Sequence, residues 1–390
     1  MGMMKTVKAI GVDFGGTSIK IGVTCGSEVL TKAEPLPTQQ FDSPKSIMAA
    51  MCGSIRGLLQ EHPDAVAVGL GMPGWVDFYK GVLYQLTNVP VWSQQEPVRE
   101  IMGAELGLPI VLDNDANCMA YGEWKLGAGR GMENITCLTL GTGIGGGMVV
   151  NNRMLRARNV SCAELGQTSI DYRGKVGTFG NLGAVEEYIG NNEIAAYASE
   201  RYKAIGQHRE PADCTPYALS RLAAQGDELA VEIYREVAEK LACMMMNVMY
   251  AFAPEAFILG GGVAKAGDLL FKPLEECLRR QLFPVHAANL RILPAAFGAD
   301  SGLSLDLLAR KAFGSKGSYL PSAMISFTQI GWFGVGVAMF AIPVANELLG
   351  GSTAAEWILV IIAGACMTAS AYYGIKSLTV VSYIAVPLVA

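Results

Sequence analysis

Cysteine pairs at metal-binding or redox spacing are missing from this sequence. None of the nine cysteines forms a C-x-x-C pair, and the three histidines stand outside the motifs described below. Four cysteines stand in or beside apolar runs: Cys25, Cys118, Cys137 and Cys243. Because free cysteine behaves as a small apolar residue in a reducing compartment, we expect buried, reduced thiols in a cytosolic protein.

An excess of positive charge is also missing. The formal net charge is −5 and the sequence pI is about 5.4. Nucleic-acid-binding domains present a basic patch or stripe, so this balance argues against a nucleic-acid partner. Residues 1–8 lead directly into an apolar strand, so no secretory signal is visible. The length of 390 residues is enough for two or three domains.

Charged residues almost vanish after Lys316. Residues 321–345 form an apolar run long enough to cross a bilayer, which takes about 20 residues. Residues 357–373 form a shorter candidate, and residues 378–390 begin a third. We therefore expect a hydrophobic α-helical tail of two to three partial transmembrane helices over residues 305–390. The basic residues before the first run predict that the preceding part of the chain is cytoplasmic and that the tail enters the inner membrane.

The stretch from Val111 to Gly147 carries the first chemical signal. One apolar strand ends at Asp113-Asn114-Asp115-Ala116-Asn117, and a second ends at Gly141-Thr142-Gly143-Ile144-Gly145-Gly146-Gly147. A carboxylate at a strand end can accept the proton of an attacking hydroxyl, and glycines let backbone N–H groups approach phosphate oxygens. This combination predicts phosphoryl transfer, in which positioning and charge stabilisation do most of the catalysis.

A similar turn stands near the N-terminus. An apolar run ends at Asp13-Phe14-Gly15-Gly16-Thr17, and a second run follows over Ile19–Val23. The pattern is typical of an ordinary hairpin. It also fits a phosphate loop in which Asp13 holds a water of Mg²⁺. Because the two glycine turns resemble each other, the sequence indicates a duplicated strand-turn-strand core with ATP between two lobes.

Helical periodicity is clear in three segments. It predicts a helix over residues 44–61 with Ser43 as its cap, and further helices over residues 193–205 and 218–249. A break at Gly226 is expected within the last of these segments.

Several motifs in order resemble the ROK family of sugar kinases and repressors, within the actin-like ATPase superfamily. The resemblance covers about residues 7–304 and implies an α/β, two-lobed actin-like ATPase (ribonuclease H-like) fold. It places the catalytic aspartate in an N-terminal lobe over residues 1–122, followed by a C-terminal lobe over residues 123–304. The motifs are Gly11–Thr17, Gly71–Gly74, Asp113–Asn117, Gly141–Gly147, Ala163–Gly166 and Leu259–Val263, with a last turn at Gly298–Gly302.

The same resemblance implies ATP with Mg²⁺ as phosphoryl donor, a hexose as acceptor, and roles for individual residues. Asp115 matches the catalytic base. The residues that match sugar-contacting positions are Gly74, Asn88, Asn114, Glu164, Gln167 and Glu186. The residues that match the phosphate loops are Asp13, Gly15, Gly16, Thr17, Gly141, Thr142 and Gly143, and those on the adenosine side are Gly260, Gly261 and Gly262.

One feature of the family is missing. Many ROK proteins hold a structural zinc with one histidine and three cysteines, but the corresponding residues here are Gln167, Gly177, Phe179 and Ala184. Zinc needs about four nitrogen or sulfur ligands, so we predict no zinc. We expect Phe179 and Leu182 to fill the vacated volume by apolar packing. Gln167 can still form a hydrogen bond where the family's histidine touches sugar, but the replacement leaves sugar choice open.

The tail resembles a different family, the cytosine/purine permeases of the nucleobase–cation symporters. Residues 307–343 carry this resemblance, and Gln329 and Trp332 match the region where that family contacts its nucleobase. The match covers only a fragment of a permease, so we expect no transport path. We interpret the tail as the product of a broken gene fusion or an assembly chimera.

The leading hypothesis is a cytoplasmic hexose kinase, most simply a glucokinase. One alternative is a non-catalytic ROK-type sugar sensor or repressor, which the acidic charge and the six residues before the first strand disfavour. Another is a membrane permease fragment fused to a kinase, which rests on the tail alone. The acceptor stays open among glucose, N-acetylmannosamine, N-acetylglucosamine, fructose and allose. We also expect membrane association through residues 321–390 and, because the family often dimerises, a homodimer.

Overall fold

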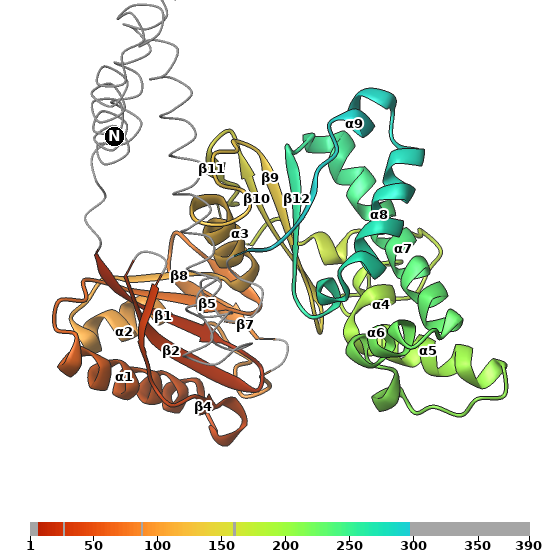
Figure 1. Cartoon of the computed structure of the whole chain (residues 1–390). Helices are drawn as coiled ribbons and strands as arrows, with labels where there is room; N and C mark the ends of the chain where they lie inside the picture. Colours follow the sequence, from red (N-terminus) through yellow and green to blue (C-terminus); the bar gives the residue numbers. More distant parts are fainter. Residues whose placement is uncertain (1–6, 26–27, 87–88, 159–160, 297–390) are drawn as a thin grey trace, which may run out of the picture. The chain divides into compact units, whose positions relative to one another are not determined.

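The computed structural model describes residues 7–25, 28–86, 89–158 and 161–296 (Figure 1). These residues fall within one compact unit, residues 1–304. Asn88, the turn at residues 298–302 and the predicted transmembrane tail lie outside the described residues. Within the described ranges, no helix combines the length and apolarity needed to span a membrane. The proposed lobe boundary between residues 122 and 123 stays a prediction.

The first sheet brings three parallel strand ends to one edge. Its order is β3-β2-β1-β5-β8, and β4 pairs with β2. β1 runs antiparallel to β2 and parallel to β5, which runs parallel to β8. The register aligns Asp13 with Gly71 and Gly71 with Asp113. The strands are β1 (Lys8–Phe14), β2 (Ser18–Cys25), β3 (Glu28–Lys32), β4 (Leu36–Pro37), β5 (Val68–Met72) and β8 (Ile110–Asn114).

Helices α1 (Pro44–Glu61) and α2 (Val98–Leu106) contact this sheet and each other. The predicted bounds of α1 are confirmed, and Ser43 forms a capping box in which its hydroxyl accepts the Ser46 N–H at 3.2 Å. The apolar face of α1 is buried with the strands, as the helical spacing predicts. The hairpin β6 (Trp75–Asp77) and β7 (Val82–Gln85) adds further apolar residues to this core.

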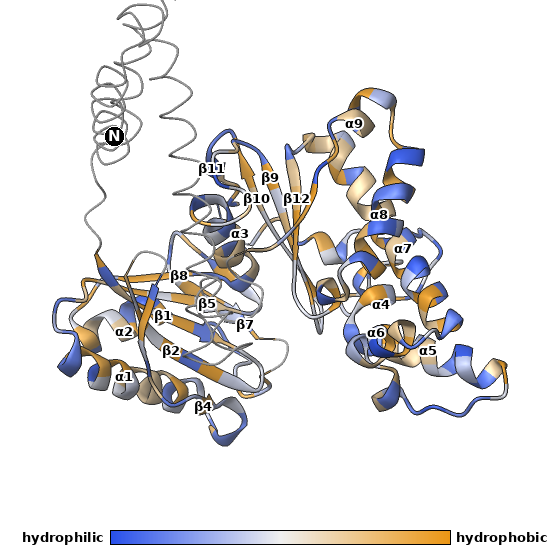
Figure 2. Cartoon of the chain, viewed as in Figure 1, coloured by the Kyte–Doolittle hydropathy of each residue, from blue (hydrophilic) through white to orange (hydrophobic). Residues whose placement is uncertain are grey.

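The second sheet repeats the arrangement of the first. Its order is β11-β10-β9-β12-β13, and β9 runs antiparallel to β10 and parallel to β12. Each sheet therefore contains an antiparallel pair joined by a glycine turn, beside a parallel strand, which confirms the predicted duplication. The strands are β9 (Ile135–Leu140), β10 (Ile144–Val150), β11 (Arg153–Met154), β12 (Ala256–Gly260) and β13 (Ile292–Pro294). β9 and β12 carry mostly hydrophobic residues (Figure 2).

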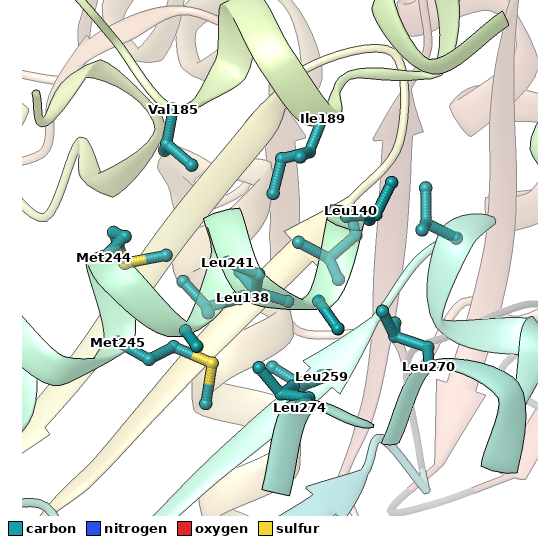
Figure 3. Close-up of a cluster of buried hydrophobic side chains, with 14 of the residues drawn as sticks. Leu138, Leu140, Val185, Ile189, Leu241, Met244, Met245, Leu259, Leu270 and Leu274 are labelled. Atoms are coloured by element: carbon teal, nitrogen blue, oxygen red, sulfur yellow. The ribbon is translucent and has the colours of Figure 1, made fainter. Parts of the chain in front are cut away.

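Helices cover one face of the second sheet and form the larger core. Leu138 and Leu140 from β9 pack in one cluster with Met244 and Met245 from α7 and Leu270 from α8 (Figure 3). Gly226, at a φ of +91°, lies between α6 and α7, so the expected helix break is confirmed. The helices of this region are α4 (Glu186–Ile189), α5 (Asn191–Ala204), α6 (Pro216–Ala224), α7 (Glu228–Phe252), α8 (Asp268–Gln281) and α9 (Pro284–Ala288).

Helix α3 (Asp115–Lys125) packs on β9 and β10. Its Ala120 lies in a smaller buried cluster with Ile135, Val149 and Ile258. α3 begins where β8 of the first sheet ends, so one short helix links the two sheets. Its first turn lies against β10, because a Cβ on Gly145 would lie 2.8 Å from the Ala116 Cβ.

The prediction of buried, reduced thiols is only partly correct. The eight cysteines in the described ranges are free, and Cys137 is buried. Cys118, in contrast, is exposed, although a Cβ on Gly71 would lie only 3.4 Å from its Sγ. Cys25 and Cys243 are half-buried.

Candidate active site

Asp115 lies at the junction between β8 and α3. Asn114 caps the helix, since its Oδ1 accepts the N–H of Ala116 at 2.9 Å and that of Asn117 at 3.4 Å. Asp115 is the first helical residue, where the helix dipole favours a negative charge. Its side chain is open to solvent, and its Oδ1 accepts the Ala116 N–H at 2.8 Å. The local fold therefore fixes an accessible carboxylate at the end of a strand.

The surroundings make Asp115 a better base than an ordinary aspartate. Although part of its surface is open to solvent, protein atoms surround Asp115 closely enough that desolvation raises its pKa to about 6. The N–H of Ala116 opposes this shift, and the charges of Asp13 and Glu164 add to it. At pH 7 such a carboxyl is mostly ionised and still basic enough to accept a proton. Asp13 and Glu164, from two other segments, therefore lie near enough to Asp115 for their charges to act on it.

The first glycine turn is tightly built. The Gly15 N–H donates to the Ser18 carbonyl at 3.0 Å, and a Cβ on Gly15 would lie 2.8 Å from that oxygen. The Thr38 hydroxyl donates to the Gly15 carbonyl at 2.8 Å. Asp13 and Thr17 are exposed and Gly16 is half-buried, so this turn leaves accessible groups at the strand end.

The second glycine turn is held by two neighbours. The Gly141 N–H donates to the Gly143 carbonyl at 3.0 Å, and the Gly141 carbonyl accepts the Asn191 N–H at 2.9 Å. Glu186 Oε2 accepts the Ile144 N–H at 2.7 Å, and a Cβ on Gly143 would lie 2.5 Å from the same oxygen. Thr142 is exposed at the tip of this turn.

Gly145 and Gly147, later glycines of this motif, have a packing role. A Cβ on Gly145 would lie 2.8 Å from the Ala116 Cβ, and one on Gly147 would lie 2.6 Å from the Ala120 Cβ. Both therefore face α3. Their lack of side chains lets the helix that begins with Asp115 approach β10 closely.

Gly74 acts on the site through Asn114. It has a φ of +87°, and a Cβ there would lie 2.3 Å from the Gln85 carbonyl, so only glycine fits. Its carbonyl accepts the Asn114 Nδ2 at 3.1 Å. The predicted sugar residues Gly74 and Asn114 are thus joined directly, and Asn114 also caps α3.

Glu164, Gln167 and Glu186, three of the predicted sugar-contacting residues, lie together. Gln167 Nε2 donates to Glu186 Oε1 at 3.2 Å, and the Gln167 N–H donates to the Glu164 carbonyl at 3.1 Å. Burial raises the pKa of Glu164, and the charge of Glu186 adds to the shift. The three residues form a polar wall that reaches both Asp115 and the second glycine turn.

The predicted adenosine side borders a cavity of about 380 Å³. Gly261 has a φ of +89° and lies against the Leu140 carbonyl, which a Cβ would approach to 2.3 Å. Gly260 ends β12, and Gly262 lines the cavity. The other lining residues are Asn191, Thr215, Pro216, Tyr217, Ser220, Lys265 and Ala266. A larger cavity of about 790 Å³ shares Thr215 and Tyr217 with it but includes none of the predicted site residues.

Comparison with known families decides the classification. The model of the ROK family matches residues 9–305. The chain belongs to the ROK family. A second family model, of permeases for cytosine/purines, uracil, thiamine and allantoin, matches residues 282–390. Both predicted resemblances are therefore confirmed.

Individual relatives of this ROK chain include sugar kinases. A glucokinase of Streptomyces coelicolor is 36% identical over 309 residues, which cover 75% of this chain and 94% of the relative. An N-acetyl-D-glucosamine kinase of Photobacterium profundum is 28% identical over 311 residues, which cover 75% of this chain and 96% of the relative. Among solved structures, this chain is similar to a ROK family glucokinase from Streptomyces griseus, crystallised in complex with glucose and AMPPNP. The sequence identity is 32% and the TM-score is 0.65, and the match covers 76% of this chain and 96% of the glucokinase. These relationships confirm the predicted class, an ATP-dependent sugar kinase with the α/β actin-like fold of ROK sugar kinases.

The zinc ligands of other ROK proteins have no counterpart in the donor chemistry of this chain. Gln167, Gly177, Phe179 and Ala184 offer no thiolate or imidazole. No group of three or more histidine, cysteine, aspartate or glutamate side chains in the described ranges could hold a metal ion. The expected apolar filling is wrong, however. Phe179 is 47% exposed and Leu182 is 45% exposed, because the loop turns both side chains outward.

Sequence reasoning missed Arg156 of this ROK chain. Its guanidinium forms a buried ion pair with Asp113, two residues before the predicted base. Arg156 follows the short strand β11, where no motif marks it, and it reaches Asp113 of β8 from 43 residues away in the sequence. A single arginine outside the glycine turns gave no local signal.

Proposed function

We propose that this ROK protein transfers the γ-phosphoryl group of MgATP to a hexose, with glucose as the first candidate. The observation that carries the proposal is Asp115, a solvent-accessible carboxylate with a pKa of about 6 beside a glycine turn. The glucokinases among its relatives support glucose as the acceptor. The N-acetyl-D-glucosamine kinase is a more distant relative, so that sugar comes second.

In the proposed reaction a sugar hydroxyl attacks the γ-phosphorus of ATP. Asp115 accepts the hydroxyl proton as the new O–P bond forms, and the bond from the γ-phosphorus to the bridging oxygen breaks to release ADP. The terminal hydroxyl is the preferred acceptor because it is the least hindered. Asn114 positions the base by capping the helix and by holding the Gly74 carbonyl.

Phosphate binding is assigned to the accessible residues of the two turns. The N–H groups of Gly15 and Gly141 already donate within their own turns. We therefore assign direct phosphate contacts to Gly16, Thr17 and Thr142, with Asp13 next to the magnesium that accompanies ATP. The cavity lined by Gly262 takes the adenosine in this proposal. Glu164, Gln167 and Glu186 contact the sugar hydroxyls.

The test is an ADP-release assay over a panel of hexoses with the full chain. Asp115→Asn should lower kcat by about 10²–10⁴-fold, the usual contribution of a general base, while sugar binding measured directly stays within about threefold. Asp268→Asn is the matched control, because Asp268 is the first residue of α8 and pairs with Lys272 on the surface. Near-normal turnover of Asp115→Asn would remove Asp115 from its role. No ADP release with any hexose would refute the proposed activity.

Placement in the cell also remains a proposal. We propose that the catalytic part of the chain lies in the cytoplasm and that residues 321–390 associate with the membrane. The match of the permease family model to residues 282–390 supports the membrane association. Sedimentation of the full chain with membranes, released by detergent but not by salt, is the expected result. Recovery in the soluble fraction would contradict it.

A further inference from the structure

The loop from Asp171 to Ala184 contains the positions that match the zinc-ligating cysteines of other ROK proteins, and here a tight turn closes it. The Gly177 N–H donates to the Asn181 carbonyl at 2.7 Å, and the Gly180 N–H donates to the Gly177 carbonyl at 2.9 Å. The Gly183 N–H donates to the Lys175 carbonyl at 2.7 Å. These bonds fold the loop back on itself through the main chain alone.

Side chains of α4 anchor the loop from outside. Glu187 Oε1 accepts both the N–H of Thr178, at 3.0 Å, and its hydroxyl, at 3.2 Å. The hydroxyl of Tyr188 accepts the N–H of Lys175 at 3.0 Å. The loop therefore has fixed contacts at several points that involve no metal ligand.

Asn181 connects the loop to the polar wall of the site. Its Nδ2 donates to the Gln167 carbonyl at 2.9 Å. Gln167 in turn donates to Glu186, which accepts the Ile144 N–H beside the second glycine turn. An unbroken series of hydrogen bonds thus runs from Asn181 to the phosphate-binding turn. The Asn181 Oδ1 is buried without a protein partner among the described residues, so the donor side of this amide makes the connection.

We propose that Asn181 is a positioning residue that holds Gln167 and Glu186 for the sugar through hydrogen bonds alone, in a loop that contains no structural zinc. The sugar-positioning part rests on the proposed function, whereas the absence of zinc does not. A hydrogen bond to a main-chain carbonyl is directional and short, so it can fix the position of Gln167 as a metal ligand would.

The first experiment uses the unmodified full chain and needs no activity. The purified protein is assayed for metal content, and its thermal unfolding is followed with and without the zinc chelator o-phenanthroline. We expect substoichiometric zinc and an unchanged Tm. One zinc per chain together with a lower Tm on chelation would overturn the proposal.

The second experiment replaces the amide. Asn181→Asp keeps the shape but turns the donor into an acceptor facing the Gln167 carbonyl, and Asn181→Ala removes it. Both should raise the hexose KM about tenfold, the effect of losing one partly buried hydrogen bond, with kcat and the ATP KM changed less than about threefold. Asn289→Ala is the matched control, because Asn289 also donates its Nδ2 to a carbonyl, that of Val285, on the exposed helix α9.

The outcomes separate the two proposals. An active wild-type protein whose Asn181 variants keep the wild-type hexose KM would refute the positioning role while the kinase activity stands. Equal rises in both KM values would indicate general damage and also count against it. If the wild-type protein phosphorylates no hexose, the proposed function fails, and the metal content still decides whether the loop works without zinc.

Discussion

Arg156 donates two hydrogen bonds to one carboxylate oxygen of Asp113, from Nη2 at 2.6 Å and from Nε at 3.1 Å. The other oxygen of Asp113 accepts the Asn117 Nδ2 at 3.0 Å. The guanidinium carbon lies 3.9 Å from the centre of the Phe78 ring. Since Asp113 is two residues from Asp115, this ion pair fixes the strand end that carries the proposed base.

Replacing Arg156 should therefore damage both stability and catalysis. Arg156→Met leaves the Asp113 carboxylate buried and without its charge partner, and breaking such a pair costs about 3–5 kcal/mol. Because the Arg156 side chain is 19% exposed, we expect the lower end of this range. Urea denaturation gives the free energy of unfolding, and kcat should fall as well.

An exposed ion pair provides the control for Arg156. Arg56 pairs with Glu105 at 2.9 Å, with 52% of the Arg56 side chain exposed. Surface pairs contribute about 0–1 kcal/mol, so Arg56→Met should change the free energy of unfolding by less than about 1 kcal/mol and leave kcat unchanged. Equal losses in the two variants would show that the Arg156 pair has no special role.

The pKa of Asp115 predicts an acidic limb in the activity profile. The carboxyl must be ionised to accept a proton, and its pKa is raised to about 6, so kcat/KM should rise with pH up to about pH 6 and then level off. An unperturbed aspartate would place this limb near pH 4. A buffer series from pH 4.5 to 8 checks it. Activity that is constant across this range would contradict the assignment of the base to Asp115.

The close approach of α3 to β10 predicts that side chains at Gly145 and Gly147 are not tolerated. Gly147→Ala places a Cβ 2.7 Å from the Ala116 carbonyl, and such overpacking costs about 1–3 kcal/mol. The displaced helix should also carry Asp115 out of position and lower kcat. Thermal unfolding and steady-state kinetics measure the two effects.

Helix α1 contains a glycine at which a side chain should be tolerated. Gly53 lies within α1 with no atom in the way of a Cβ, so Gly53→Ala should stabilise the protein by about 0.5–1 kcal/mol with unchanged kcat. A destabilised Gly53→Ala variant, or a Gly147→Ala variant that behaves like the wild type, would refute the packing argument.

The sequence predicts those parts of the structure whose conformation depends on neighbouring residues in the chain. Ser43 and the apolar spacing after it specify α1, and the glycine turns with their flanking apolar runs specify the two hairpins. Arg156 was not predictable because its partner lies 43 residues away, and its position depends on tertiary folding. The expectation that Phe179 fills the volume of a missing zinc site is wrong because its ring lies on an exposed loop, where it pairs with the ring of Trp75.

That pairing gives the last prediction. The rings of Phe179 and Trp75 lie 5.2 Å apart, centre to centre, and each side chain is more than 40% exposed. Trp75 follows Gly74 directly, so the pair joins the Asp171–Ala184 loop to the segment that positions Asn114. Aromatic pairs contribute about 0.5–1.5 kcal/mol, so Phe179→Ala should raise the hexose KM about two- to tenfold while kcat changes little. Phe283→Ala, at a 64% exposed position beside α9, is the control and should match the wild type. Glucose titration followed by tryptophan fluorescence checks the same loss of affinity without turnover, and unchanged affinity in Phe179→Ala would show that the ring pair has no part in sugar binding.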